Sequence, residues 1–263
     1  MSHAPSFFTK PAALIVAHPG HELRLHGWLQ RTRPWVGVLT DGSGHADRSR
    51  LDSTTALLHN VGARPLEIYG RFTDRALYVL LLAGDAKPFC QLAEELAGAL
   101  VTRRIQYVVS DASEGYNPVH DMCRVLTDTA VRLVETRGGP HIDLYDFPLS
   151  ERPDFPLAER RFAPVVLHLD DEAFARKRAA AAAYDTLAGE IDSLLAQWGE
   201  EVFRLECLRL VKPWERWNRV EPPEYERIGS ARIAMGRYQQ VIRYWEHIAP
   251  LTDALRRFAE TPA

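Results

Sequence analysis

Short apolar runs alternate with amphipathic stretches through the first 150 residues, and this alternation constrains the fold more than any other feature of the sequence. Residues 12–17 and 35–40 are apolar and too short for helices, so we predict that they are buried strands. Residues 22–31 and 119–135 carry apolar side chains at helical spacing. Strands that alternate with helices predict an α/β fold whose mostly parallel sheet is covered by helices on both faces. The further predicted strands are residues 66–69, 105–110 and 141–145, and the further predicted helices are residues 49–61 and 88–102.

The pattern changes beyond residue 150, where a proline-rich segment at residues 152–164 predicts an extended surface connection. Residues 170–198 predict one long helix, because Asp170 is a good N-cap and the alanine run within the segment favours helix. Residues 201–211 alternate in hydrophobicity like a strand packed on the sheet. The last third therefore predicts an extension of mixed helix and strand.

Residues 237–248 are amphipathic, and their expected core face is Val241, Ile242, Trp245 and Ile248. Neither an internal repeat nor a low-complexity linker divides the sequence. We therefore expect a single α/β domain over residues 1–263, in which residues 151–263 pack on a core of residues 1–150.

The charge and cysteine content exclude several classes of partner. The formal net charge is −3, with both signs spread along the chain, so we expect no nucleic-acid partner. No uncharged apolar run approaches the roughly 20 residues that cross a bilayer, so we expect no membrane partner. Cys90, Cys123 and Cys207 form neither a metal-binding pair nor a disulfide framework, which favours a reducing, cytoplasmic location.

Three histidines follow predicted strands in positions that suit a metal site. His18 and His21 come directly after the strand at residues 12–17, and His120 follows the strand at residues 105–110. The carboxyl ends of parallel strands meet at one edge of a sheet, where ligands bind. Three nitrogen ligands with an open fourth position are typical of a catalytic zinc site, and they also suit Fe²⁺, Mn²⁺ or Co²⁺.

The segment Ala-His-Pro-Gly-His-Glu at residues 17–22 resembles the His-Pro-Asp-Asp-Glu signature of the LmbE-like, or PIG-L, N-deacetylases. Asn-Pro-Val-His at residues 117–120 is similar to the second motif of that family, His-Pro-Asp-His, and Thr-Asp-Gly at residues 40–42 also fits the family pattern. The resemblance covers about residues 1–150. It implies a Rossmann-like zinc enzyme that removes acetyl groups from N-acetylglucosamine-type conjugates, with metal ligands at His18, His21 and His120.

The sequence also departs from the family pattern. Gly20 replaces the aspartate that is the general base of the family, and His21 stands where the family has a metal-binding aspartate. Asn117 and Val119 replace the histidine and the aspartate of the second motif. A third imidazole makes the bare metal site more positive, so it polarises bound water more strongly and depends less on a neighbouring carboxylate.

Other polar residues near the predicted sheet edge are candidates for catalysis and substrate binding. Asp41, Glu114 and Tyr116 are the predicted catalytic residues, with Glu22 and Asp111 as further carboxylates near the motifs. Arg50 and Asn117 are the predicted substrate-binding residues. Trp214, Trp217 and Tyr225 suit a sugar-binding wall, and packing of the extension on the sheet explains them equally well.

These residues predict a zinc-dependent amidohydrolase that removes an acyl group from an N-acyl amino sugar or a related small amide. Its expected partner is a small-molecule substrate, namely a sugar conjugate. Two alternatives stay open: another metal-dependent enzyme of a biosynthetic pathway on the same scaffold, and a non-catalytic protein that binds a sugar conjugate through a degenerate site. A third reading is that no metal binds and that the histidines are surface residues.

Overall fold

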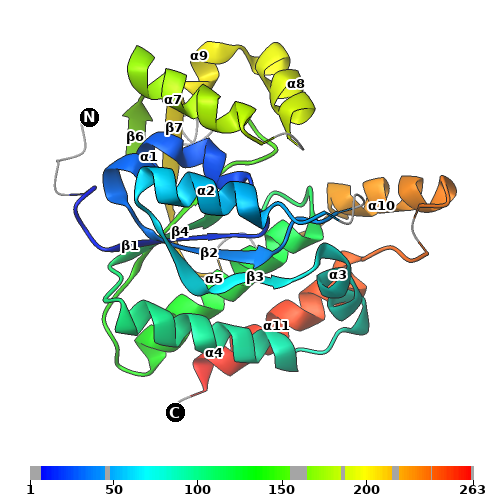
Figure 1. Cartoon of the computed structure of the whole chain (residues 1–263). Coiled ribbons are helices and arrows are strands. Elements are labelled where there is room, and N and C mark those ends of the chain that lie inside the picture. The colour runs from blue at the N-terminus through cyan, green and yellow to red at the C-terminus, as the bar shows by residue number, and fades with distance from the viewer. Residues whose placement is uncertain are drawn as a thin grey trace.

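The computed structural model describes residues 7–44, 48–154, 165–184, 187–214, 219–237 and 239–261 (Figure 1). These residues form a seven-stranded sheet in the order β3-β2-β1-β4-β5-β7-β6. Its parallel part consists of β1 (Ala12–Val16), β2 (Trp35–Thr40), β3 (Arg64–Phe72), β4 (Tyr107–Asp111) and β5 (Asp143–Phe147). The predicted α/β class with a mostly parallel sheet is confirmed.

Both faces of the sheet are buried, which explains why β1 is apolar at every position. Ala13 and Ile15 contribute to one hydrophobic core, whereas Leu14 and Val16 contribute to the other. This alternation follows from the two-residue period of a strand. The first core packs against α3 (Asp74–Ala83), α4 (Lys87–Thr102), α5 (Pro118–Thr136) and α11 (Ala249–Glu260), and the second packs against α1 (His26–Thr32), α2 (Leu51–Val61) and α7 (Asp171–Ala182).

The last third of the chain extends the same sheet with two strands, β6 (Val165–His168) and β7 (Leu205–Val211). Strand β7 is antiparallel to both β5 and β6. The buried carboxylate of Glu206 on β7 accepts hydrogen bonds from the backbone N–H groups of Gly27 and Trp28, at the start of α1. Lys177 Nζ on α7 lies 2.9 Å from the same carboxylate. Polar contacts as well as apolar packing thus join the extension to the N-terminal core.

The prediction of one helix over residues 170–198 is wrong. Helix α7 ends at Ala182, and α8 (Ala188–Trp198) begins after a break. Tyr184 in that break is 1% exposed, and its hydroxyl contacts the carboxylate of Glu22. The alanine run favours helix locally, but this long-range contact requires the chain to leave the helix. Tertiary structure therefore overrides propensity at this point.

Other boundaries in the last third differ from the sequence reading. Helix α9 (Glu200–Phe203) precedes β7, where a continuous strand was predicted. In the 237–248 segment, the described residues before Tyr244 are not helical, and η2 (Tyr244–Ile248) leads into α11. Trp245 is 49% exposed, so it does not belong to the core face. Helices α3, α10 (Glu224–Ala234) and α11 were not predicted. Of the predicted connection at residues 152–164, residues 155–164 lie outside the described residues.

Among the described residues, no helix combines the length and the apolar character needed to cross a bilayer.

Candidate functional site

The candidate site lies where the order of the sheet changes direction. Strands β1 and β4 are parallel neighbours at the centre of the sheet, with β2 beyond β1 and β5 beyond β4. In an open α/β sheet, ligands bind outside the carboxyl ends of the strands at such a switch point. His18 lies two residues after β1, and Asp111 is the last residue of β4. The motif histidines therefore lie where the topology places a ligand.

The structure brings the three predicted metal ligands together. The ring centroids are 5.3 Å apart for His18 and His21, 5.1 Å for His18 and His120, and 4.6 Å for His21 and His120. Three imidazoles that share a tetrahedral ion, with metal–nitrogen distances of about 2.0–2.1 Å, would have ring centroids roughly 5 Å apart. The spacing of the rings therefore fits one shared ion.

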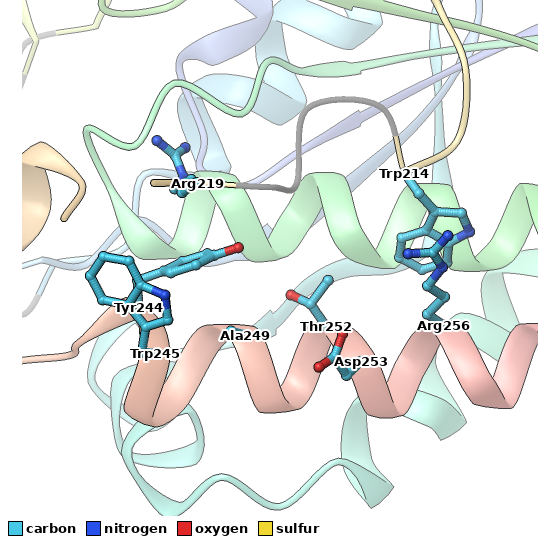
Figure 2. Close-up of a pocket in the computed structure, with 8 residues that line it drawn as sticks. All are labelled: Trp214, Arg219, Tyr244, Trp245, Ala249, Thr252, Asp253 and Arg256. Atoms are coloured by element: carbon cyan, nitrogen blue, oxygen red, sulfur yellow. The ribbon is translucent and has the colours of Figure 1, made fainter. Parts of the chain in front are cut away.

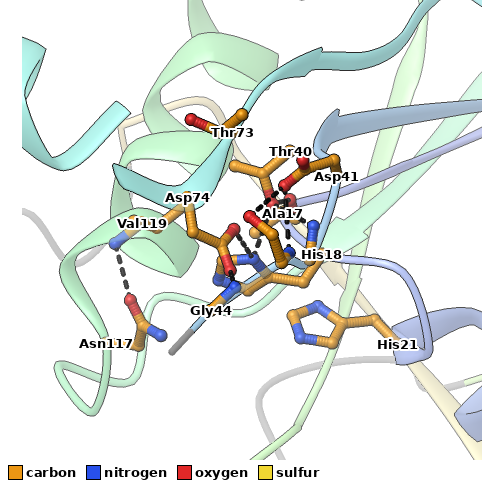
Figure 3. A network of polar contacts seen from close by, with 12 residues as sticks. Ala17, His18, His21, Thr40, Asp41, Gly44, Thr73, Asp74, Asn117 and Val119 are labelled. Carbon is orange, nitrogen blue, oxygen red and sulfur yellow. Dashed lines mark hydrogen bonds and ion pairs between the residues drawn. The ribbon is translucent and has the colours of Figure 1, made fainter. Parts of the chain in front are cut away.

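Carboxylates contact two of the rings, and Figure 3 shows that of Asp74 beside His18. His18 Nδ1 lies 2.7 Å from Thr40 Oγ1 and 3.1 Å from Asp74 Oδ1, and His21 Nδ1 lies 2.9 Å from Asp111 Oδ2. Because a carboxylate accepts hydrogen bonds, we assign the proton to Nδ1 in both rings. Nε2 is then the basic nitrogen, which is the arrangement found in metal-bound histidines.

Backbone contacts fix the segments that carry these histidines. Asp111 Oδ2 also accepts a hydrogen bond from the backbone N–H of Ala17, which joins the end of β4 to the end of β1. On α5, Asn117 is the N-cap, and its Oδ1 accepts from the N–H of Val119. Pro118 occupies the first turn, where a missing N–H costs nothing. The start of α5, and with it His120, is therefore set by its cap.

Burial favours the neutral form of His21 and His120. Desolvation, followed by the neighbouring His18, lowers the pKa of His21 well below its usual value. Desolvation, followed by electrostatic repulsion from His21 and His18, lowers the pKa of His120 in the same way. Neutral imidazole is the form that binds a metal ion. Burial also raises the pKa of the Asp111 carboxyl to about 6.

The residues fit a metal ion in one further respect. Asp111 Oδ1 is buried and has no hydrogen-bond partner among the described residues, and a nearby cation would compensate for this orphaned acceptor. Within the same described part of the chain, no group of three or more His, Cys, Asp or Glu side chains is placed so that it could hold a metal ion as it stands. The rings therefore lie close together without forming a finished coordination set.

Arg50, a predicted substrate-binding residue, lies near the cluster. Its positive charge contributes to the lowered pKa of His21. Gly42 has φ +67°, and a Cβ there would lie 2.6 Å from Arg50 Nε and 2.8 Å from Pro19 Cδ, so only glycine lets these residues approach. Arg50 Nε is buried without a hydrogen-bond partner among the described atoms. A guanidinium with an unused donor suits an oxygen of a bound ligand.

Four other predicted residues are engaged elsewhere or exposed. Asp41 Oδ1 accepts hydrogen bonds from the N–H and the hydroxyl of Ser43. The Glu114 carboxylate accepts from three consecutive backbone N–H groups, those of residues 149–151. Tyr116 is 50% exposed, and Asn117 is the cap described above. The catalytic and substrate-binding roles of these residues stay predictions.

Sequence reasoning missed Asp74 and Thr40, the partners of His18. Thr40 ends β2, so its place at the carboxyl edge of the sheet was a usable signal. Asp74 follows Thr73, whose hydroxyl caps α3. A Thr-Asp pair is a typical start of a helix, and here it directly follows β3, at the carboxyl edge of the sheet. Only the tertiary structure shows that its carboxylate reaches His18.

A separate pocket of about 260 Å³ lies along α11 (Figure 2). It is lined by Trp214, Arg219, Tyr244, Trp245, Ala249, Thr252, Asp253 and Arg256. Trp214 thus lines a pocket, whereas Tyr225, from the same predicted sugar-binding wall, is buried in the core. Trp217 lies outside the described residues.

Comparison with known proteins supports the fold and leaves the family open. No protein-family model and no curated protein matches the sequence. Among solved structures, the conserved protein TT1542 from Thermus thermophilus is 19% identical, with a TM-score of 0.53, and the match covers 81% of this chain and 100% of that one.

Two further similar structures are described as deacetylases. A deacetylase triple mutant involved in the teicoplanin biosynthetic pathway is 15% identical, with a TM-score of 0.52, and the match covers 79% of this chain and 100% of that one. The A40926 pseudoaglycone deacetylase Dbv21 is 17% identical, with a TM-score of 0.51 and coverage of 78% and 98%. At these identities the likeness shows a shared Rossmann-like α/β fold.

Proposed function

We propose that the chain is a metal-dependent hydrolase of the LmbE-like, or PIG-L, type, which removes the acyl group from an N-acyl amino sugar or a related small amide. One observation carries the proposal. The imidazoles of His18, His21 and His120 lie ring to ring at the switch point of a fold that two deacetylases share. Burial favours the neutral form of His21 and His120, and neutral imidazole is the form that binds a metal ion.

The donor set suits Zn²⁺, and also Fe²⁺, Mn²⁺ or Co²⁺. His18, His21 and His120 would hold the ion, and a bound ion supplies Lewis acidity that polarises an acyl carbonyl. Asp74 and Asp111 keep the rings of His18 and His21 in the tautomer whose Nε2 is basic, through the contacts at Nδ1.

Two residues complete the proposed roles on the substrate side. We assign Arg50 to an oxygen of the substrate, because its buried Nε has no hydrogen-bond partner among the residues that the structure describes. We assign Tyr116 to proton donation toward the leaving nitrogen, because its side chain is half exposed on the loop that leads into α5. The carboxylates of Asp41 and Glu114 bind Ser43 and three backbone amides, which makes them less suited to proton transfer.

Acetate release from N-acetylglucosamine and its conjugates tests the proposal. We expect turnover by the purified protein supplied with Zn²⁺, Fe²⁺, Mn²⁺ or Co²⁺, and a loss of at least about 100-fold in His120→Ala. His141→Ala is the matched control, because His141 is an exposed histidine that pairs with Glu135 and Asp143. Acetate release that is absent with every metal, or equal in His120→Ala and the wild type, would overturn the proposal.

A further inference from the structure

The break between α7 and α8 brings one tyrosine of the C-terminal extension to the histidine turn. Tyr184 is almost completely buried, and its hydroxyl contacts Glu22 Oε1. The same hydroxyl lies 2.9 Å from Thr54 Oγ1 on α2. Because Tyr184 follows Glu22 by 162 residues, this contact joins two parts of the chain that sequence alone would not associate.

The Glu22 carboxylate also contacts the backbone of the turn. The Glu22 side chain is fully buried, and its Oε2 accepts a hydrogen bond of 2.8 Å from the backbone N–H of Gly20. Gly20 lies between His18 and His21, the two ligands that the turn supplies. One carboxylate therefore ties the backbone between two proposed metal ligands to the hydroxyl of Tyr184.

A second residue of the extension packs on the same turn independently. Gly20 has φ +106°, a conformation that side chains rarely adopt, and a Cβ there would overlap Leu187 Cδ1. Leu187 is half-buried and is the N-cap of α8. The space over Gly20 is therefore filled by Leu187, and a larger residue at position 20 requires Leu187 to move.

We propose that Tyr184 and Leu187 belong to the site as positioning residues, which hold the turn of His18 and His21 in the shape that binds the ion. The inference deepens the proposed function and rests on it for the metal. Tyr184 acts through Glu22 on the Gly20 amide, and Leu187 acts by packing against Gly20. The extension then has a defined role, which is to complete the support of the metal-binding turn.

Amide hydrogen exchange of the peptide at residues 12–25 tests the positioning without any metal. We expect Tyr184→Phe to speed exchange in this peptide about 10-fold, because Glu22 loses a hydrogen bond that holds it against the Gly20 amide. Tyr69→Phe is the matched control, since the Tyr69 hydroxyl makes the equivalent contact with Thr55, the next residue of α2, and makes no hydrogen bond to Glu22 among the described residues. Leu187→Ala provides a second test if Tyr184→Phe does not fold.

Titration with Co²⁺, followed by its visible absorption, tests the consequence for the site. We expect Tyr184→Phe and Leu187→Ala each to weaken binding about 10-fold and to change the spectrum, whereas Tyr69→Phe leaves both unchanged. Wild-type exchange and wild-type Co²⁺ affinity in both variants would overturn the inference, as would equal changes in Tyr69→Phe. If the wild type binds no Co²⁺, the proposed function fails, and the exchange rates alone decide whether these residues position the turn.

Discussion

Two buried polar clusters flank α5, and they differ in how their charges are paired. In the first, Arg124 on α5 donates to Asp128 Oδ1 and to Asp146 Oδ2 at 2.7 Å, and Arg209 on β7 donates to both oxygens of Asp146 at 2.8 Å. In the second, the histidine cluster, carboxylates contact Nδ1 of His18 and His21, and the three imidazoles meet edge to face. The charges of the first cluster are balanced within the protein, whereas the second is the cluster that we propose binds a cation.

The pKa shifts in the two clusters have opposite directions. Burial alone would lower the pKa of Arg124, but Asp128 and Asp146 outweigh it and raise that pKa. For His21 and His120, burial and the neighbouring imidazoles act together, and both lower the pKa. Buried charge that is fully paired stabilises a fold when it is intact, and buried neutral donors that converge suggest a binding site.

Asp146→Ala breaks the balanced cluster and has the largest expected effect on stability. It leaves Arg124 and Arg209 buried without their shared partner, which lowers the free energy of unfolding by about 3–5 kcal/mol. Urea denaturation measures this loss. Asp143→Ala on the same strand removes only an exposed contact with His141, so we expect less than about 1 kcal/mol. Similar losses in the two variants would contradict the contrast between the clusters.

Asp111→Asn sharpens the comparison at the histidine cluster. The substitution keeps the shape of the side chain but weakens the acceptor that orients His21, so Zn²⁺ affinity falls about 10- to 100-fold. Calorimetric titration of the apoprotein measures the affinity, with Asp143→Asn as the control. An affinity equal to that of the wild type would mean that Asp111 does not act on the ligand.

Asn117→Ala has the smallest expected effect. The side chain caps α5, so its loss costs about 1 kcal/mol of stability, and Asn117→Asp, which can still cap, keeps most of it. Thermal unfolding measures both variants. The sequence predicts substrate binding by Asn117, and a raised KM in Asn117→Asp with unchanged stability would favour that role over capping.

The parallel strands and the meeting of three histidines could be predicted from the sequence, because both follow from local patterns. The apolar run before His18 and the apolar run before His120 each predict a strand, and parallel strands share a carboxyl edge. These two predicted strands were enough to predict that the three histidines lie close together. The conformation of the turn itself was not predictable in the same way.

The supporting residues could not be predicted, since they depend on contacts between distant segments. Asp74 begins a helix that was not predicted. Tyr184 lies between α7 and α8, where the helix propensity of the sequence predicts a continuous helix. Glu114 was a reasonable catalytic candidate by position, but its carboxylate binds the amides of residues 149–151. Local patterns therefore predicted that the three histidines meet and did not predict the residues that support them.

Calorimetric titration of Zn²⁺ into the apoprotein tests the central claim most directly. The account predicts one ion per chain in the wild type and an affinity at least about 100-fold lower in each of His18→Ala, His21→Ala and His120→Ala, with His141→Ala unchanged. Equal affinity in the wild type and in all four variants, or no binding by the wild type, would contradict it.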